Sequence, residues 1–137
     1  MAVELIRVTG LKEFRRNLRA MDKNLPKGLR LAGNAAAQIV VDTARPRVPR
    51  LTGRAAGSVR ASSTQGAARV SGGGARVPWY PWLDFGGRVG RNRSVRRPFL
   101  KEGRYIWAAF ADRRADVQDR LRDELVKVAR GAGIEAD

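Results

Sequence analysis

The apolar residues in the last third of the chain recur at helical spacing, and this pattern constrains the fold more than any other. The spacing predicts one long helix from about Arg104 to Arg130, for which Gly131 is a suitable end. Six side chains form the apolar stripe, with Arg114 interrupting it: Trp107, Phe110, Val117, Leu121, Leu125 and Val128. A helix with one apolar face has to pack against another layer of structure.

The first third of the chain predicts a strand followed by two helices. The strand covers Val3 to Val8, with Val3 and Leu5 on one face. A first helix is predicted from four residues at helical spacing, Leu11, Phe14, Leu18 and Met21. A second helix runs from Pro26 to about Ala44. One side of it carries Leu29, Ala32, Ala36, Ile39, Val40 and Thr43. Its small residues, Gly33 and Ala35 to Ala37, either admit a close neighbour or are simply good helix formers.

The middle of the chain predicts short β structure and turns. Residues 45–49 end the second helix, because each proline disfavours helical geometry in the residue before it. One helical turn follows, up to Ala56. Two strands of a hairpin are predicted at residues 58–63 and 67–71. A flexible break is predicted at the three glycines, residues 72–74. The expected fold is therefore α+β, a small antiparallel sheet with a hairpin, covered by two N-terminal helices and one long C-terminal helix.

The length and composition fit one domain spanning residues 1–137. Hydrophobic residues make up 43% of the 137 and charged residues 30%, enough to bury a core. No stretch approaches the roughly 20 apolar residues that span a bilayer, and the N-terminus has no secretory signal pattern. We therefore expect a protein made in a cytoplasm-like space, with no membrane partner.

Cysteine and histidine are both absent from the chain. This excludes disulfides, thiol nucleophiles, Cys/His zinc sites and proton transfer by imidazole. The carboxylates do not form an obvious acid–base pair or a metal cluster, and no phosphate-binding glycine motif is present. We therefore expect a protein that is not an enzyme and that has no catalytic residues, no cofactor and no metal site.

Positive charge is concentrated in the middle of the chain. The formal net charge is +15, and residues 45–104 hold fourteen basic and two acidic residues, a net of +12. The remaining residues hold fourteen basic and eleven acidic ones, a net of +3. A field of this sign favours phosphate backbones or an acidic protein surface as the partner. A general bias toward arginine would not explain why the excess lies in the middle.

Residues 86–97 predict a mobile, exposed basic loop. It contains the five candidate partner-binding arginines, Arg88, Arg91, Arg93, Arg96 and Arg97. They could be solvated, contact phosphates, or clamp acidic residues of a protein partner. The spacing does not choose between the last two.

Four aromatic residues precede this loop: Trp79, Tyr80, Trp82 and Phe85. Such side chains can stack on unpaired bases. However, Trp79, Trp82 and Phe85 are three residues apart, which places them on one face of a short helix. This spacing favours packing in the core or at a subunit interface.

Four short motifs occur in a characteristic order. They are Val8-Thr9-Gly10-Leu11-Lys12-Glu13-Phe14, Val48-Pro49-Arg50-Leu51-Thr52-Gly53 with Ser58, Pro78-Trp79-Tyr80-Pro81-Trp82-Leu83-Asp84-Phe85-Gly86, and Arg97-Pro98-Phe99-Leu100. In this order the chain resembles the tail-completion, or head–tail joining (neck), family of long-tailed bacteriophages, from Val8 to the middle of the last helix. Two features depart from the family pattern. Residues 55–57 lack the leucine that commonly follows Thr-Gly, and the arginine run before Pro98 is longer.

The resemblance implies a structural virion protein at the head–tail junction. Members form rings, commonly of six copies, between the portal-side connector or stopper ring and the tail tube or its terminator protein. Double-stranded DNA passes through the lumen. By this resemblance Phe14, Leu18, Trp107 and Phe110 form the core, and residues 79–85 hold the arginine loop at a ring surface. We expect most of these arginines to contact protein, because a channel lined with arginines would hold the DNA tightly and obstruct ejection of the genome.

The alternative is a basic, single-domain nucleic-acid-binding protein. That function predicts tight, salt-sensitive binding of nucleic acid by the isolated chain. A connector predicts weak or non-specific binding and a ring that depends on its partner.

Overall fold

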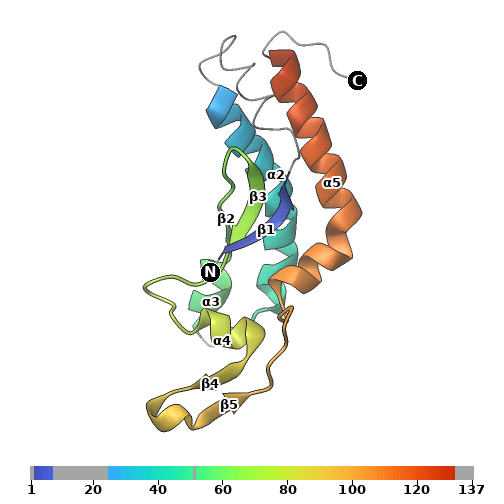
Figure 1. Ribbon diagram of the computed structural model, residues 1–137. Helices are drawn as coiled ribbons and strands as arrows, with labels where there is room; N and C mark the ends of the chain where they lie inside the picture. Colours follow the sequence, from blue (N-terminus) through green and yellow to red (C-terminus); the bar gives the residue numbers. More distant parts are fainter. Residues whose placement is uncertain (1, 8–24, 51, 132–137) are drawn as a thin grey trace.

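The computed structural model describes residues 2–7, 25–50 and 52–131, and shows an α+β fold (Figure 1). The helices are α2 (Leu25–Ala44), α3 (Arg54–Ser58), α4 (Tyr80–Phe85) and α5 (Ile106–Gly131). The strands are β1 (Ala2–Arg7), β2 (Arg60–Ala61), β3 (Ala67–Ser71), β4 (Gly87–Val89) and β5 (Val95–Arg97). Two short 3-10 helices, η1 (Arg45–Arg47) and η2 (Arg91–Arg93), complete the described elements.

The first three strands form an antiparallel sheet in the order β1-β3-β2. Val3 of β1 and Ala61 of β2 both pair with Val70, so β3 is central. Alternation along β1 buries Val3 and Leu5 and exposes Glu4. The predicted N-terminal strand and the hairpin are therefore confirmed. The first hairpin strand is shorter than predicted at both ends, since α3 extends to Ser58 and β2 ends at Ala61.

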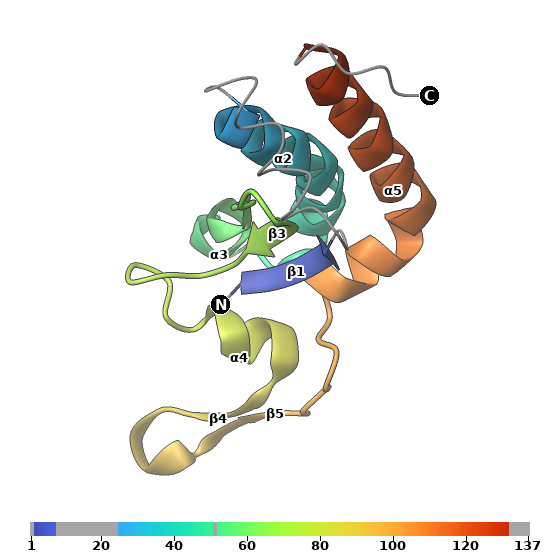
Figure 2. The same ribbon diagram turned by 45° about the horizontal axis from the view of Figure 1, so that its top comes forward.

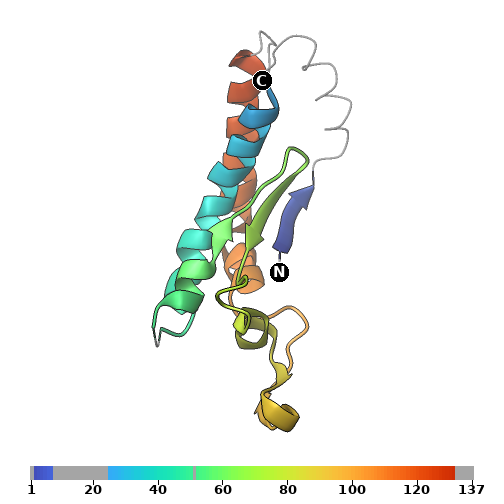
Figure 3. The ribbon, with the colours of Figure 1, turned by 90° about the vertical axis from the view of Figure 1, so that its left-hand side faces the viewer.

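Helices α2 and α5 form a layer on this sheet, which Figure 3 shows from the side. Helix α2 packs against β3, and α5 packs against both α2 and β1. The predicted side of α2 faces inward, with Leu29, Ala32, Ala36 and Val40 buried. The second predicted N-terminal helix is thus confirmed, whereas the first, with Phe14 and Leu18, falls outside the described residues.

The small residues of α2 permit close packing within the chain. A Cβ placed on Gly33 would lie 2.8 Å from Cβ of Ser63, next to the β2–β3 turn. Near the other end, a Cβ on Gly28 would meet the Val128 side chain of α5 at 3.6 Å. Asn34 adds a polar contact, since its Oδ1 accepts a hydrogen bond from the Ser63 amide at 2.8 Å. The close neighbours at these positions therefore belong to the same chain.

The long C-terminal helix is confirmed, although its buried face also uses residues outside the predicted stripe. Phe110, Val117 and Leu121 are buried as predicted, and Ile106 and Ala109 join them. Trp107 is half-buried and meets Phe110 edge-to-face, with ring centroids 6.0 Å apart. Arg114, which interrupts the stripe, lies over the Phe110 ring at 5.3 Å. None of the described helices is long and apolar enough to cross a membrane.

Candidate interaction site

The predicted basic loop forms a regular β-hairpin. Strands β4 and β5 pair antiparallel, and η2 turns the chain between them. Figures 1 and 2 show this hairpin beyond α4, at the end of the molecule opposite the C-terminal end of α5. The segment predicted to be a mobile loop is therefore a β-hairpin with a short turn, and its exposure is as expected. Positive φ angles at Gly90 and Asn92 (87° and 60°) let the chain reverse within so few residues.

The two faces of the hairpin differ in chemistry. Arg88 pairs directly with Arg96 across the strands, and Val89 pairs with Val95 in the next register position. Because successive side chains point to opposite faces, the arginine pair and the valine pair lie on opposite sides. All four residues are exposed. Like charges directly opposite each other disfavour strand pairing, so the arginine face concentrates positive charge at a cost to the hairpin.

The five candidate arginines do not act alike. Arg88, Arg93 and Arg96 are exposed on the hairpin, and Arg91 lies in η2. Arg97 is half-buried at the base of the hairpin and binds the chain itself. Its Nε donates to the Leu83 carbonyl at 3.1 Å and its Nη2 to the Tyr105 hydroxyl at 2.9 Å. Its guanidinium also lies 5.7 Å from the centre of the Trp82 ring. Arg97 therefore anchors the hairpin.

Asp84 is the centre of this anchor, and sequence reasoning missed it. Its side chain is 1% exposed, and its Oδ1 accepts hydrogen bonds from the amides of Arg104 at 2.7 Å and Tyr105 at 3.1 Å. Its Oδ2 accepts from the Tyr80 hydroxyl at 3.0 Å. These bonds join α4 to the segment that begins α5. Arg104 strengthens the same junction by donating to the carbonyls of Asp84 and Pro98.

Tyr80 is the fully buried aromatic of the predicted group. Burial, followed by the negative charge of Asp84, raises the pKa of its hydroxyl well above the usual value. Its ring rests on residues 72 and 73, where a Cβ on Gly72 would overlap it. Gly72 and Gly73 are themselves buried. The glycine run therefore permits close packing here, and is not simply a flexible break.

The other three aromatics are less buried than their spacing predicts. The short helix is present as α4, but Tyr80 and Asp84 form its buried face. Trp79 is 39% exposed, whereas Trp82 and Phe85 are half-buried. Trp82 serves the hairpin, because its Nε1 donates to the Gly87 carbonyl at 3.1 Å. Residues 79–85 thus pack at the base of the hairpin, and Trp79 is open to solvent.

Exposed apolar side chains gather around the hairpin. Among the described residues six large apolar side chains are exposed, and five of them fall between residues 79 and 100. These five are Trp79, Val89, Val95, Phe99 and Leu100, with Phe99 the most open at 69%. Large apolar side chains that group on a protein surface are typical of protein–protein contact sites. We call these five residues, with Arg88, Arg93 and Arg96, the hairpin surface. It includes both faces of the hairpin, with Arg88 and Arg96 on one and Val89 and Val95 on the other.

No arrangement for metal chemistry appears in the described part of the chain. Within it, no group of three or more aspartate or glutamate side chains converges on one point. The hydrogen bonds of Asp84 go to the backbone and to Tyr80, so this carboxylate has a structural role.

Comparison with known proteins finds no match: no protein-family model, no curated protein and no solved structure resembles this chain significantly. The likeness to the tail-completion family therefore rests on the four sequence motifs.

Proposed function

We propose that this chain is a structural protein of a long-tailed bacteriophage. In this proposal it forms a ring at the head–tail junction, joins the portal-side connector to the tail tube, and leaves a channel for the genome. The hairpin surface is the observation that carries the proposal. It combines exposed arginines and exposed apolar side chains on an element that projects from the body.

The mixture of side chains on this surface favours a protein partner. Arginine pairs with carboxylates in a planar, two-point geometry, and apolar residues such as Phe99 gain from burial against another protein. A phosphate backbone has no apolar surface against which Phe99 or Leu100 could be buried. An acidic partner would also relieve the repulsion between Arg88 and Arg96.

The anchor of the hairpin suits a connecting role. Its base is fixed to α4 and to the start of α5 by Arg97, Asp84 and Arg104. The hairpin therefore loses little conformational freedom when it binds a partner. In a ring, several copies of the surface engage one neighbouring ring together. Contacts that are weak individually then bind strongly as a set.

The test is to find the chain in assembled particles. Tailed particles made from the genome that encodes the chain would be purified and imaged by electron cryomicroscopy. We expect a ring of copies between head and tail, with the hairpin surface against an adjoining ring. Complete particles that lack the chain, together with tight nucleic-acid binding by the free protein at physiological salt, would favour the alternative of a nucleic-acid-binding protein.

A further inference from the structure

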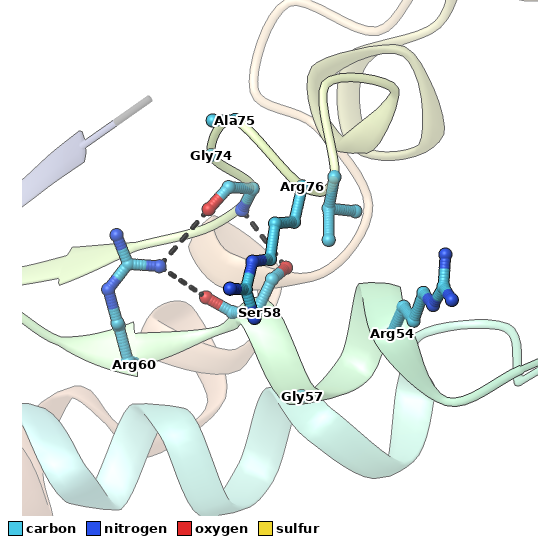
Figure 4. A pocket seen from close by; sticks show the side chains of 9 residues that line it. Arg54, Gly57, Ser58, Arg60, Gly74, Ala75 and Arg76 are labelled. Carbon is cyan, nitrogen blue, oxygen red and sulfur yellow. Dashed lines mark hydrogen bonds between the residues drawn. The ribbon is translucent and has the colours of Figure 1, made fainter.

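A second basic feature lies in the body of the protein, away from the tip of the hairpin. It is a cleft of about 900 Å³ between α3 and the turn that follows β3. Figure 4 shows Arg60 of β2 at one side of it, Arg76 reaching from the turn toward Ser58, and Arg54 of α3 at the other side, pointing outward. The resemblance to the phage family and the proposed joining function assign nothing to these three residues.

The charge of this cleft has one sign. None of the nine residues that line it is acidic, and three are arginines with exposed side chains. Among the ion pairs found within the described residues, none involves Arg54, Arg60 or Arg76. Their positive charge is thus available to an anion from outside the chain.

Hydrogen bonds join the two walls of the cleft. Arg60 Nη1 donates to the carbonyls of Ser58 at 3.0 Å and Gly73 at 3.1 Å, which orients its guanidinium at the rim. Ser58 Oγ accepts from the Gly73 amide at 3.0 Å and donates to the Ala55 carbonyl at 2.6 Å. Figure 4 draws the bonds among Arg60, Ser58 and Gly73. The arginines therefore project from a frame that is already formed.

The remaining lining lets a backbone approach closely. A Cβ on Gly57 or Gly74 would have no neighbour within 4 Å, so both positions open onto free space. No aromatic side chain lines the cleft, and its one larger apolar residue, Val77, is buried. It therefore lacks the apolar anchors of a protein-binding site and the stacking surfaces that hold unpaired bases.

We infer that this cleft binds the phosphodiester backbone of a nucleic acid, through Arg54, Arg60 and Arg76, without reading its sequence. Guanidinium groups match phosphate geometry, and DNA presents a dense row of such phosphates. Contacts of this kind let a protein slide along the duplex, so they are compatible with DNA that moves past. The inference does not depend on the proposed function.

The first experiment measures binding of the full chain to a labelled DNA duplex of arbitrary sequence, by fluorescence anisotropy over a range of salt concentrations. The cleft variant is Arg54→Gln with Arg76→Gln; Arg60 is kept because it holds the frame. The matched control is Lys27→Gln with Arg30→Gln, two exposed cations in the N-terminal part of α2, with the same loss of net charge.

We expect the cleft variant to bind at least about tenfold more weakly at 100 mM salt, with a salt slope shallower by about 1.8. The control should keep nearly the wild-type slope. Equal losses in both variants overturn the inference, because total charge alone would then explain binding.

A second pair of variants tests the cleft without removing an arginine. Gly57→Glu places a carboxylate at the open edge, whereas Gly57→Gln places a neutral group of the same size there. We expect the glutamate variant to lose DNA affinity relative to the glutamine variant while both keep the wild-type circular dichroism spectrum. Equal affinities overturn the inference. Binding of polyglutamate is measured in parallel. A cleft variant that loses more affinity for polyglutamate than for DNA also overturns the inference, since the site would then be one for acidic protein. Either failure leaves the hairpin surface and its joining function unaffected.

Discussion

The carboxylate of Asp84 accepts the backbone N–H of Arg104 at 2.7 Å, although twenty residues separate the two in sequence. This bond closes the segment that contains the whole β4–β5 hairpin. This buried acid therefore helps to hold the orientation of the hairpin, together with Arg97 and Arg104.

Replacing Asp84 with alanine should destabilise the protein strongly. The amides of Arg104 and Tyr105 and the hydroxyl of Tyr80 would lose their acceptor in a buried site. Each unsatisfied donor costs about 1–3 kcal/mol, so we expect a loss of about 3 kcal/mol or more in the free energy of unfolding by urea. Asp84→Asn is the matched control, because its oxygen still accepts from the two amides, and it should be distinctly more stable than the alanine variant. Equal stability of the two variants would contradict the role of these hydrogen bonds.

Stability should fall in alkaline solution because of Tyr80. Burial and the charge of Asp84 raise the pKa of the Tyr80 hydroxyl in the folded protein, whereas a tyrosine in an unfolded chain ionises near pH 10. Above about pH 10 the unfolded chain therefore loses a proton that the folded one keeps. The resulting decrease is about 1.4 kcal/mol per pH unit. Urea unfolding from pH 9 to 11 should show this extra decrease in the wild type and not in Tyr80→Phe, and identical pH profiles would show that the hydroxyl is not held neutral.

The helices and the main sheet could be predicted because their signals extend over many residues. The stripe from Trp107 to Val128 repeats through several turns, and β1 alternates between exposed and buried side chains over residues 2–5. Strands β4 and β5 have three residues each, too few to show alternation, and their pairing brings two arginines together. The sequence pattern therefore indicated a loop.

The buried face of α4 was harder to predict for a different reason. The spacing of Trp79, Trp82 and Phe85 suggested an apolar face, yet Tyr80 and Asp84 are the buried residues. That choice depends on partners far away in sequence, the glycines at 72 and 73 and the amides at 104 and 105. A short helix carries too little pattern of its own to reveal such contacts.

Gly72 should tolerate no side chain. A Cβ there would overlap the Tyr80 ring, which is itself fully buried and cannot move aside. Overpacking of this kind costs about 1–3 kcal/mol, so Gly72→Ala should lower the free energy of unfolding by that amount. Gly66→Ala is the control, since a Cβ at Gly66 has open space and should change stability little. Denaturant unfolding of the two variants measures the difference, and a Gly72→Ala protein as stable as the wild type would show that the ring can shift.

The arginines of the hairpin surface should be dispensable for folding and necessary for joining. Changing Arg88, Arg93 and Arg96 to serine removes exposed charge and the unfavourable Arg88–Arg96 pair, so stability should be unchanged or slightly higher. By contrast Arg97→Ser removes hydrogen bonds to Leu83 and Tyr105, and should destabilise the protein by about 1–3 kcal/mol.

In particles that carry the triple serine variant, we expect electron microscopy to show separate heads and tails. A triple variant of Lys27, Arg30 and Arg122 to glutamine has the same change in net charge and leaves the hairpin intact, so heads and tails should join normally. Normal joining by the serine variant would show that these arginines do not form the contact between rings. Failure of both triple variants would instead point to the overall charge of the chain, because both lose the same charge at different places.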